Sequence, residues 1–265
     1  MSTKRRVKLT VAYDGTDFCG FAPQRDQRTV HGTLTEAVRR ATGEDVEIVG
    51  GSRTDGGAHA YGAGVHFDTV NPMPVETWRL VLNRVLEEDC RIVESEEVSS
   101  DFHARFSATS RVYRYRFLLN EFDPFRRRYT HVYWKELDLD SMKEAVKALL
   151  GEHDFRGYTE EVGPEVLNTR RKLYRVDLNE VDDEIHFEVD GIAFLRGMMR
   201  RMAGILFEIG RGHRPVEDCA RLLTEERVRM QWPIVLPAKG LTLLRINYGV
   251  LGYDARKQPW DDVED

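Results

Sequence analysis

Apolar residues recur at every second position in several short stretches of the first hundred residues, which is the period of a half-buried β-strand. The clearest case runs from Val7 to Tyr13. Helical spacing begins after Thr29, a good N-cap residue, and again after Pro74. The predicted elements are the strand 7–13, a helix between Thr29 and Gly43, the strands 46–49 and 63–68, a helix 74–85 and the strand 90–98. This order is the split βαβ pattern of ferredoxin-like and RRM-like domains.

The second half shows a similar mixture and predicts a second α+β unit. Its expected elements are the strands 111–119 and 129–134, a helix 140–150 closed by Gly151, the strands 172–181 and 185–189, a long helix 194–209, a short helix 216–223 and a last strand 241–248. We expect a boundary near residue 105, giving domains 1–105 and 106–265. The link holds no Pro/Gly-rich filler, so the halves should pack together. The fold class is α+β, with antiparallel sheets.

Composition fits a soluble globular chain of one large or two ordinary domains. The chain has 265 residues, 41% of them hydrophobic, and a formal net charge of −6, which still allows one basic groove. Cys19, Cys90 and Cys219 are scattered, so we expect neither a disulfide framework nor a zinc site, and a reducing cytoplasm. No stretch approaches eighteen consecutive apolar residues, and no apolar region follows the first six, so we expect neither a membrane span nor a signal peptide.

Residues 50–60 are the first candidate for chemistry. They read as a loop between two strands, with Arg53 and Asp55 at its tip. Its four glycines let the backbone turn tightly and leave room for a close approach. Taken alone the stretch also fits an ordinary turn, because Asp-Gly is a common turn dipeptide.

The strand 111–119 supplies a second candidate. It places Tyr113, Tyr115 and Phe117 on one face. Tyr115 and Phe117 read as core residues. Tyr113 lies at the end nearest the link between the halves, where its ring could face a cleft and stack on a base.

The long helix supplies a third candidate. Besides an apolar face, it carries a stripe of Arg196, Arg200, Ala203 and Phe207 at helical spacing. An arginine there can pair with a buried carboxylate and keep it charged. The alternative is a solvated basic face.

Arginines and aromatic residues are interleaved in the first part of the second half, where acidic residues are sparse nearby in the sequence. Such a mixture is suited to binding the phosphate backbone and unstacked bases of a nucleic acid. The alternative interpretation is a run of charged residues without a binding role. The basic residues are Arg105, Arg111, Arg114, Arg116, Arg126, Arg127, Arg128, Arg170, Arg171, Lys172 and Arg175.

Seven short motifs follow one another along the chain: Tyr13–Gly15, Ser52–Ala60, Asp101–Ala108, Arg111–Tyr115, Gly151–Phe155, Phe194–Arg200 and Pro237–Leu241. With these motifs in this order, the chain resembles the tRNA pseudouridine synthases of the TruA type. The resemblance covers nearly the whole chain. Two stretches depart from the family's usual sequence: Gly-Trp-Gln is here Gly20-Phe21-Ala22-Pro23-Gln24, and Asp-Ala-Gly-Val-His is Asp55-Gly56-Gly57-Ala58-His59.

The resemblance implies a role for each of five residues. Asp55 would be the catalytic aspartate, Tyr113 the ring that packs on the target uracil, and Arg200 the partner of Asp55. Arg53 would help hold the target base flipped out, and Leu241 would belong to a hydrophobic wall. It also implies two α+β halves joined around a central cleft, a homodimer, and conversion of uridines 38, 39 and 40 in the tRNA anticodon stem-loop.

The implied reaction needs neither a cofactor nor a metal, because uracil is detached, turned and rejoined with nothing added. Asp55 could attack ribose C1′ or remove the 2′ proton, and the sequence leaves both routes open. The Tyr113 hydroxyl could take the C5 proton in the last step.

The main alternative is a non-catalytic RNA-binding module with RRM-like sheets. A glycoside hydrolase would need two flanking carboxylates, and a zinc deaminase would need His and Cys ligands at CxxC spacing. We interpret His59 and His66 as structural or base-contacting residues.

Overall fold

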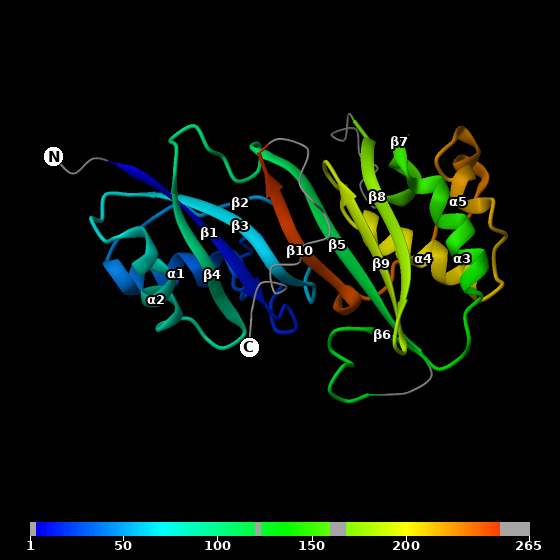
Figure 1. The fold of residues 1–265 in the computed structure, drawn as a ribbon, viewed down its shortest axis with the longest axis horizontal. Coiled ribbons are helices and arrows are strands. Elements are labelled where there is room, and N and C mark those ends of the chain that lie inside the picture. The colour runs from blue at the N-terminus through cyan, green and yellow to red at the C-terminus, as the bar shows by residue number, and fades with distance from the viewer. Residues whose placement is uncertain (1–3, 120–122, 160–167, 250–265) are drawn as a thin grey trace.

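The computed structural model describes residues 4–119, 123–159 and 168–249, and one large sheet runs across it (Figure 1). The sheet has ten strands, eight of them in the order β4-β1-β3-β10-β5-β9-β8-β7, while β2 pairs with β3 and β6 pairs with β5. The strands are β1 (Arg5–Tyr13), β2 (Val49–Gly50), β3 (His59–Thr69), β4 (Cys90–Val98), β5 (Ala108–Leu119), β6 (His131–Tyr133), β7 (Gly151–Asp154), β8 (Arg170–Val181), β9 (Glu184–Gly191) and β10 (Leu241–Tyr248).

Helices α1 and α4 lie behind the sheet in the view of Figure 1, α3 packs against α4, and α5 lies beside α3. The helices are α1 (Val30–Thr42), α2 (Val75–Asn83), α3 (Leu139–Val146), α4 (Met198–Gly210) and α5 (Asp218–Arg221), with 3-10 turns at Lys147–Leu149, Phe155–Tyr158, Glu225–Arg229 and Ala238–Gly240. The predicted α+β class is therefore confirmed.

The last strand joins the two halves into one sheet. β10 pairs with β5 in an antiparallel ladder, and on its other side it pairs in parallel with β3 through Thr242–His59 and Leu243–Ala60. The prediction of antiparallel sheets is thus incomplete, because the central pairing is parallel. The division near residue 105 stays a prediction.

Local signals predicted α1 well. The Thr29 side chain accepts a hydrogen bond from the Gly32 backbone nitrogen at 3.2 Å, and Gly43 ends the helix at φ 77°. The long helix was predicted four residues too early: α4 begins at Met198 because Gly197 adopts φ 70°, a left-handed conformation. Arg196 therefore lies before the helix, outside the stripe that contains Arg200.

The two faces of β5 differ as predicted. Tyr115 and Phe117 are buried, and the Phe117 ring stacks on Phe207 of α4 at 6.2 Å. On the opposite face Arg114 bonds to Glu188 and Arg116 to Glu184, both on the neighbouring strand β9.

The prediction that acidic residues are sparse near the arginine cluster is wrong for part of it, because several of its arginines form ion pairs. Arg126 pairs with Asp123 and Asp183, and Arg175 with Asp177 and Glu188. Asp123 and Asp177 lie within three residues of their arginines, whereas Asp183 and Glu188 lie further away in the sequence.

Two histidines, the buried His66 and the partly buried His131, predict an acid-sensitive fold. Burial is the largest cause that lowers the pKa of His66 to about 4, helped by Arg6, and burial likewise lowers the pKa of His131 to about 4. An unfolded histidine has a pKa near 6.5. The unfolded chain therefore binds more protons between these values, so we expect the unfolding free energy to fall by about 1–2 kcal/mol per histidine from pH 7 to pH 5.

Urea denaturation at both pH values measures this loss. The His131→Leu variant, which keeps an apolar neighbour for Phe117 and Phe207, should lose less stability on acidification than the wild type. An unchanged pH dependence in His131→Leu would contradict the assignment to His131.

Candidate active site

The loop between β2 and β3 ends in a tight turn that presents Asp55. The Ala58 backbone nitrogen donates to the Asp55 carbonyl at 3.1 Å, and Gly57 adopts φ 81°. A positive φ at the third residue of such a turn is the type II geometry, which favours glycine. Asp55 therefore stands at the first position of a turn whose shape depends on Gly57.

The stretch 18–21 supports this loop. The Phe21 backbone nitrogen donates to the Thr54 carbonyl at 3.1 Å, and the Gly57 nitrogen donates to the Phe18 carbonyl at 3.2 Å. Gly20 has φ 96°, and a Cβ there would lie 2.9 Å from the Thr54 oxygen. The two stretches that differ from the family's usual sequence, 20–24 and 55–59, thus keep the glycines at 20 and 57 that define the loop.

The two adjacent glycines of the turn should respond differently to substitution. A Cβ on Gly56 would meet its nearest atoms at an ordinary 3.5 Å, so Gly56→Ala should change the unfolding free energy by less than about 1 kcal/mol. Gly57→Ala forces alanine into the left-handed region and should cost about 1–2 kcal/mol. Urea denaturation of the two variants measures the contrast, and equal stabilities would contradict the turn assignment.

Three side chains from the second half contact this loop. An Arg111 guanidinium nitrogen donates to the Gly51 carbonyl at 2.9 Å. The Tyr113 hydroxyl and the Ser52 hydroxyl share a hydrogen bond of 2.6 Å. Arg200 Nη1 donates to Asp55 Oδ2 at 3.0 Å. The structure therefore brings together Asp55, Tyr113 and Arg200 around one loop.

The Asp55–Arg200 pair is oriented but remains accessible. Arg200 Nε donates to the Leu236 carbonyl at 2.6 Å, which fixes the guanidinium while Nη1 contacts the carboxylate. The side chains of Asp55 and Arg200 are 31% and 21% exposed. A ligand can reach the carboxylate, whose orientation is set by a residue of the other half.

Tyr113 is buried beside this pair. Its ring makes an edge contact with Phe194 at 4.8 Å between centroids. Burial is the main cause that raises the pKa of Tyr113, and the negative charge of Asp55 adds to it. The phenol is therefore neutral at physiological pH.

Among the described residues, neither Leu241 nor Arg53 forms a hydrogen bond or ion pair with the Asp55 carboxylate. Leu241 is buried at the start of β10, opposite Tyr115 on β5. Arg53 is exposed and makes no hydrogen bond or ion pair with any residue that the structure describes.

Sequence reasoning missed a buried link between the halves centred on His59. His59 Nδ1 accepts from the Gly15 nitrogen at 3.0 Å, and Nε2 lies 3.0 Å from the Arg128 carbonyl and 3.2 Å from the Lys239 carbonyl. His59 Nδ1 also lies 3.1 Å from Asp14 Oδ1, and burial lowers the pKa of His59 although this carboxylate acts in the opposite direction. The interpretation of His59 as structural agrees with these contacts.

Asp14 strengthens the same link. Its Oδ2 accepts from the Tyr129 hydroxyl at 2.8 Å, and its Oδ1 accepts from Thr16. Although burial opposes it, these hydrogen bonds lower the pKa of Asp14. The turn Asp14-Gly15 was the only local signal for this contact.

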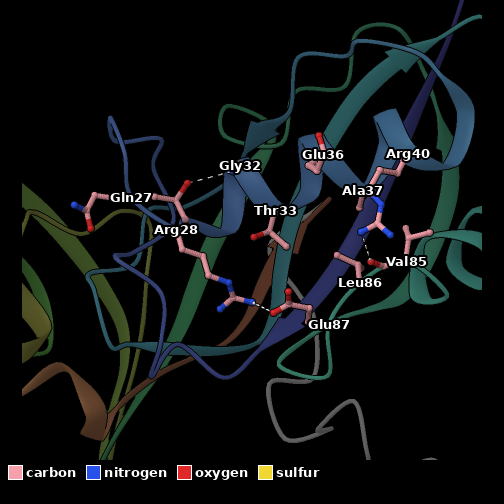
Figure 2. Close-up of a pocket in the computed structure, with 11 residues that line it drawn as sticks. Gln27, Arg28, Gly32, Thr33, Glu36, Ala37, Arg40, Val85, Leu86 and Glu87 are labelled. Atoms are coloured by element: carbon pink, nitrogen blue, oxygen red, sulfur yellow. Dashed lines mark hydrogen bonds and ion pairs between the residues drawn. The ribbon is translucent and has the colours of Figure 1, made fainter.

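Two cavities lie away from Asp55. One, with a volume of about 250 Å³, is lined by α1 and by the Val85–Glu87 segment after α2, and Figure 2 shows Arg28 and Arg40 at its wall. Another is lined by Arg214, Asp218 and nearby residues. Neither includes the Asp55 loop, so the contacts among polar side chains, and not cavity size, identify the site.

Within residues 4–119, 123–159 and 168–249, no helix has the length and apolarity needed to cross a membrane. The same residues contain no cluster of three or more His, Cys, Asp or Glu side chains arranged to hold a metal ion.

The chain is similar in sequence to proteins of one known family. The family model described as tRNA pseudouridine synthase matches residues 9–107 and 145–249, which include Asp55 and Arg200. The chain belongs to the tRNA pseudouridine synthase family. A protein named tRNA pseudouridine synthase A from Latilactobacillus sakei subsp. sakei is 39% identical over 92% of this chain and 99% of its own. One of the same name from Brevibacillus brevis is 39% identical over 92% of this chain and 100% of its own.

A solved structure of an archaeal box H/ACA sRNP Nop10-Cbf5 complex matches at 12% identity and a TM-score of 0.36, over 76% of this chain and 44% of that chain. Membership of the synthase family makes the protein an isomerase acting on tRNA. The alternative of a non-catalytic RNA-binding module is not supported.

Proposed function

We propose that this enzyme converts uridine to pseudouridine at positions 38, 39 and 40 of the tRNA anticodon stem-loop, with Asp55 as its catalytic residue. The observation that carries the proposal is the contact of Asp55 with Arg200 at 3.0 Å, next to Tyr113. An accessible carboxylate with a charged partner is what chemistry at a ribose carbon requires.

The reaction is an isomerisation. The bond from uracil N1 to ribose C1′ breaks, the ring turns, and a bond from C5 to C1′ forms, so no group is gained or lost. The target base must first leave its stack, which costs on the order of a few kcal/mol. Contacts with the flipped base and with phosphates elsewhere offset that cost.

Asp55 acts on the sugar in this proposal, either by attacking C1′ or by removing the 2′ proton. Both routes need an ionised carboxylate, and the Arg200 guanidinium stabilises that charge. Arg200 also lies where it can stabilise negative charge on the detached uracil.

Tyr113 packs on the target base in this proposal. Its hydroxyl bonds to Ser52, and its raised pKa keeps it protonated. Accepting the C5 proton would require a phenolate, which burial disfavours. The packing role therefore has more physical support than the proton-acceptor role, which stays a prediction.

Two further residues complete the proposed pocket. Arg53 is exposed on the Asp55 loop without a partner among the described residues, so it can contact the flipped nucleotide. Leu241 contributes to the apolar wall on the β10 side, next to Tyr115.

The setting of the enzyme is also part of the proposal. We infer that the enzyme is a cytoplasmic homodimer and that each chain has the domains 1–105 and 106–265. The enzyme recognises the shape of the stem-loop through arginine contacts to phosphates. Arg53, Arg105, Arg127 and Arg128 are exposed and form no ion pair with a described residue, so their charges are available to RNA.

Release of tritium from tRNA transcripts that carry 5-tritiated uridine tests the proposal, because forming the C5 bond expels that hydrogen. The control transcript has cytidine at positions 38, 39 and 40, with stem partners changed to keep base pairing. We expect release from the first transcript alone. No release from either would contradict the activity, and equal release from both would contradict the positions.

A further inference from the structure

Residues 103–107 form a compact turn that exposes an aromatic ring. The Ser107 nitrogen donates to the His103 carbonyl at 2.8 Å, and His103 Nδ1 accepts from the Arg105 and Phe106 nitrogens at 3.1 and 3.3 Å. The Phe106 ring lies against the His103 ring at 4.3 Å with an angle of 33°, yet Phe106 is 76% exposed. The turn therefore holds one face of an apolar ring towards solvent.

This turn is anchored to the sheet. The Ala104 nitrogen donates to His66 Nδ1 at 3.1 Å, and the Ala104 carbonyl accepts from the Tyr248 hydroxyl at 2.9 Å. The His103 ring also contacts the His66 ring at 5.1 Å. Since its support is fixed on two strands, Phe106 is pre-organised, which lowers the entropic cost of binding a flat partner.

One buried guanidinium connects the turn to the active-site loop. Arg111 Nη2 donates both to the Arg105 carbonyl at 2.8 Å and to the Gly51 carbonyl at 2.9 Å. A single nitrogen thus bridges the turn and the start of the loop that carries Ser52 and Asp55. The turn that carries the exposed ring is thus held against the start of the loop that presents the proposed catalytic residue.

A cation accompanies the ring. The Arg105 guanidinium lies 5.8 Å from the Phe106 centroid, is exposed, and forms no ion pair with a carboxylate of the described residues. A flat apolar face beside an unpaired guanidinium matches one nucleotide, since the base can stack on the ring and the phosphate can contact the arginine.

We propose that Phe106 and Arg105 form a nucleotide subsite that holds an unpaired RNA base next to the flipped uridine. This inference rests on the proposed function and adds to it a residue that selects an unstacked neighbour. Phe106 stacks on the flanking base and keeps it from refilling the space that the target leaves, while Arg105 contacts the adjoining phosphate. A second copy of the chain is the competing occupant, but the direct link to the Asp55 loop favours RNA.

Single-turnover tritium release over a series of stem-loop concentrations tests this subsite. Stacking of one base is worth roughly 1–3 kcal/mol, so Phe106→Ala should raise the half-saturating RNA concentration about 5- to 150-fold. The rate at saturation should stay within about threefold of wild type, because Phe106 touches no reacting atom. Phe106→Trp should restore binding, whereas Phe106→Leu, apolar but not flat, should not.

A stem-loop with 2-aminopurine on either side of the target uridine gives a direct readout. Stacking on Phe106 should quench its fluorescence at one position with wild type and Phe106→Trp, but not with Phe106→Ala. Leu80→Ala, which removes another exposed apolar side chain on α2, is the matched control and should behave as wild type.

If Phe106→Ala binds the stem-loop and quenches 2-aminopurine as the wild type does, the subsite is refuted. It is also refuted if Phe106→Ala binds more weakly and sediments differently from the wild type, because Phe106 would then contact a second copy of the chain. Either result leaves the proposed function standing if the wild type still releases tritium. Absence of tritium release by the wild type would instead refute the proposed function.

Discussion

Replacing Asp55 with asparagine is expected to reduce tritium release from tRNA by roughly 10⁴-fold. Asparagine has nearly the same shape and can still accept a hydrogen bond from Arg200, but it carries no negative charge for attack on C1′ or removal of the 2′ proton. The unfolding free energy should change by no more than about 1 kcal/mol, because the pair is partly exposed.

Asp17→Asn is the matched control, because Asp17 is an exposed aspartate in a neighbouring loop and its side chain has no hydrogen bond or ion pair with the part of the chain that the structure describes. It should keep wild-type activity. Asp55→Asn that folds normally and releases tritium at the wild-type rate would exclude Asp55 from the reaction.

Replacing Arg200 with lysine is expected to lower the single-turnover rate by roughly 10- to 100-fold, the loss of one charge-assisted hydrogen bond of about 1.5–3 kcal/mol. The guanidinium uses Nε for the Leu236 carbonyl and Nη1 for Asp55 at the same time. A lysine ammonium is one point charge and cannot keep this two-point geometry. The rate at saturating tRNA measures the effect, because the lost contact is with the catalytic group.

Arg196→Lys provides the comparison. Arg196 lies before the same helix with an exposed side chain, and lysine keeps its charge for any contact with RNA. Equal rates at saturating tRNA for Arg200→Lys and Arg196→Lys would show that the fork geometry of Arg200 is not used.

Local chemistry explains why part of the fold was predictable. The N-cap hydrogen bond of Thr29 and the left-handed Gly43 lie within α1 or next to it, so the sequence carries both signals. The start of α4 was misplaced because Leu195 is buried although it precedes the helix. The helical spacing of apolar residues therefore extends to residues before Gly197, although the helix itself begins only after that glycine.

Pairing between distant strands explains what was missed. Arg114 and Arg116 are neutralised by Glu188 and Glu184 because β9 lies beside β5 in a particular register. The short strand β7, only four residues long, lies at the sheet edge, and no alternation of its residues marks it. Side-chain partners of this kind depend on register, which a local pattern does not encode.

The sequence alone determined most helices and strands, the loop that carries Asp55, and the motifs that indicate the family, because each depends on residues close together in the chain. The tertiary structure decided how the site is assembled. Insertion of β10 between β3 and β5 joins the two halves, and Arg200 then meets an aspartate 145 residues earlier in the chain. Such a contact depends on strand order, and strand order is fixed by packing over the whole sheet.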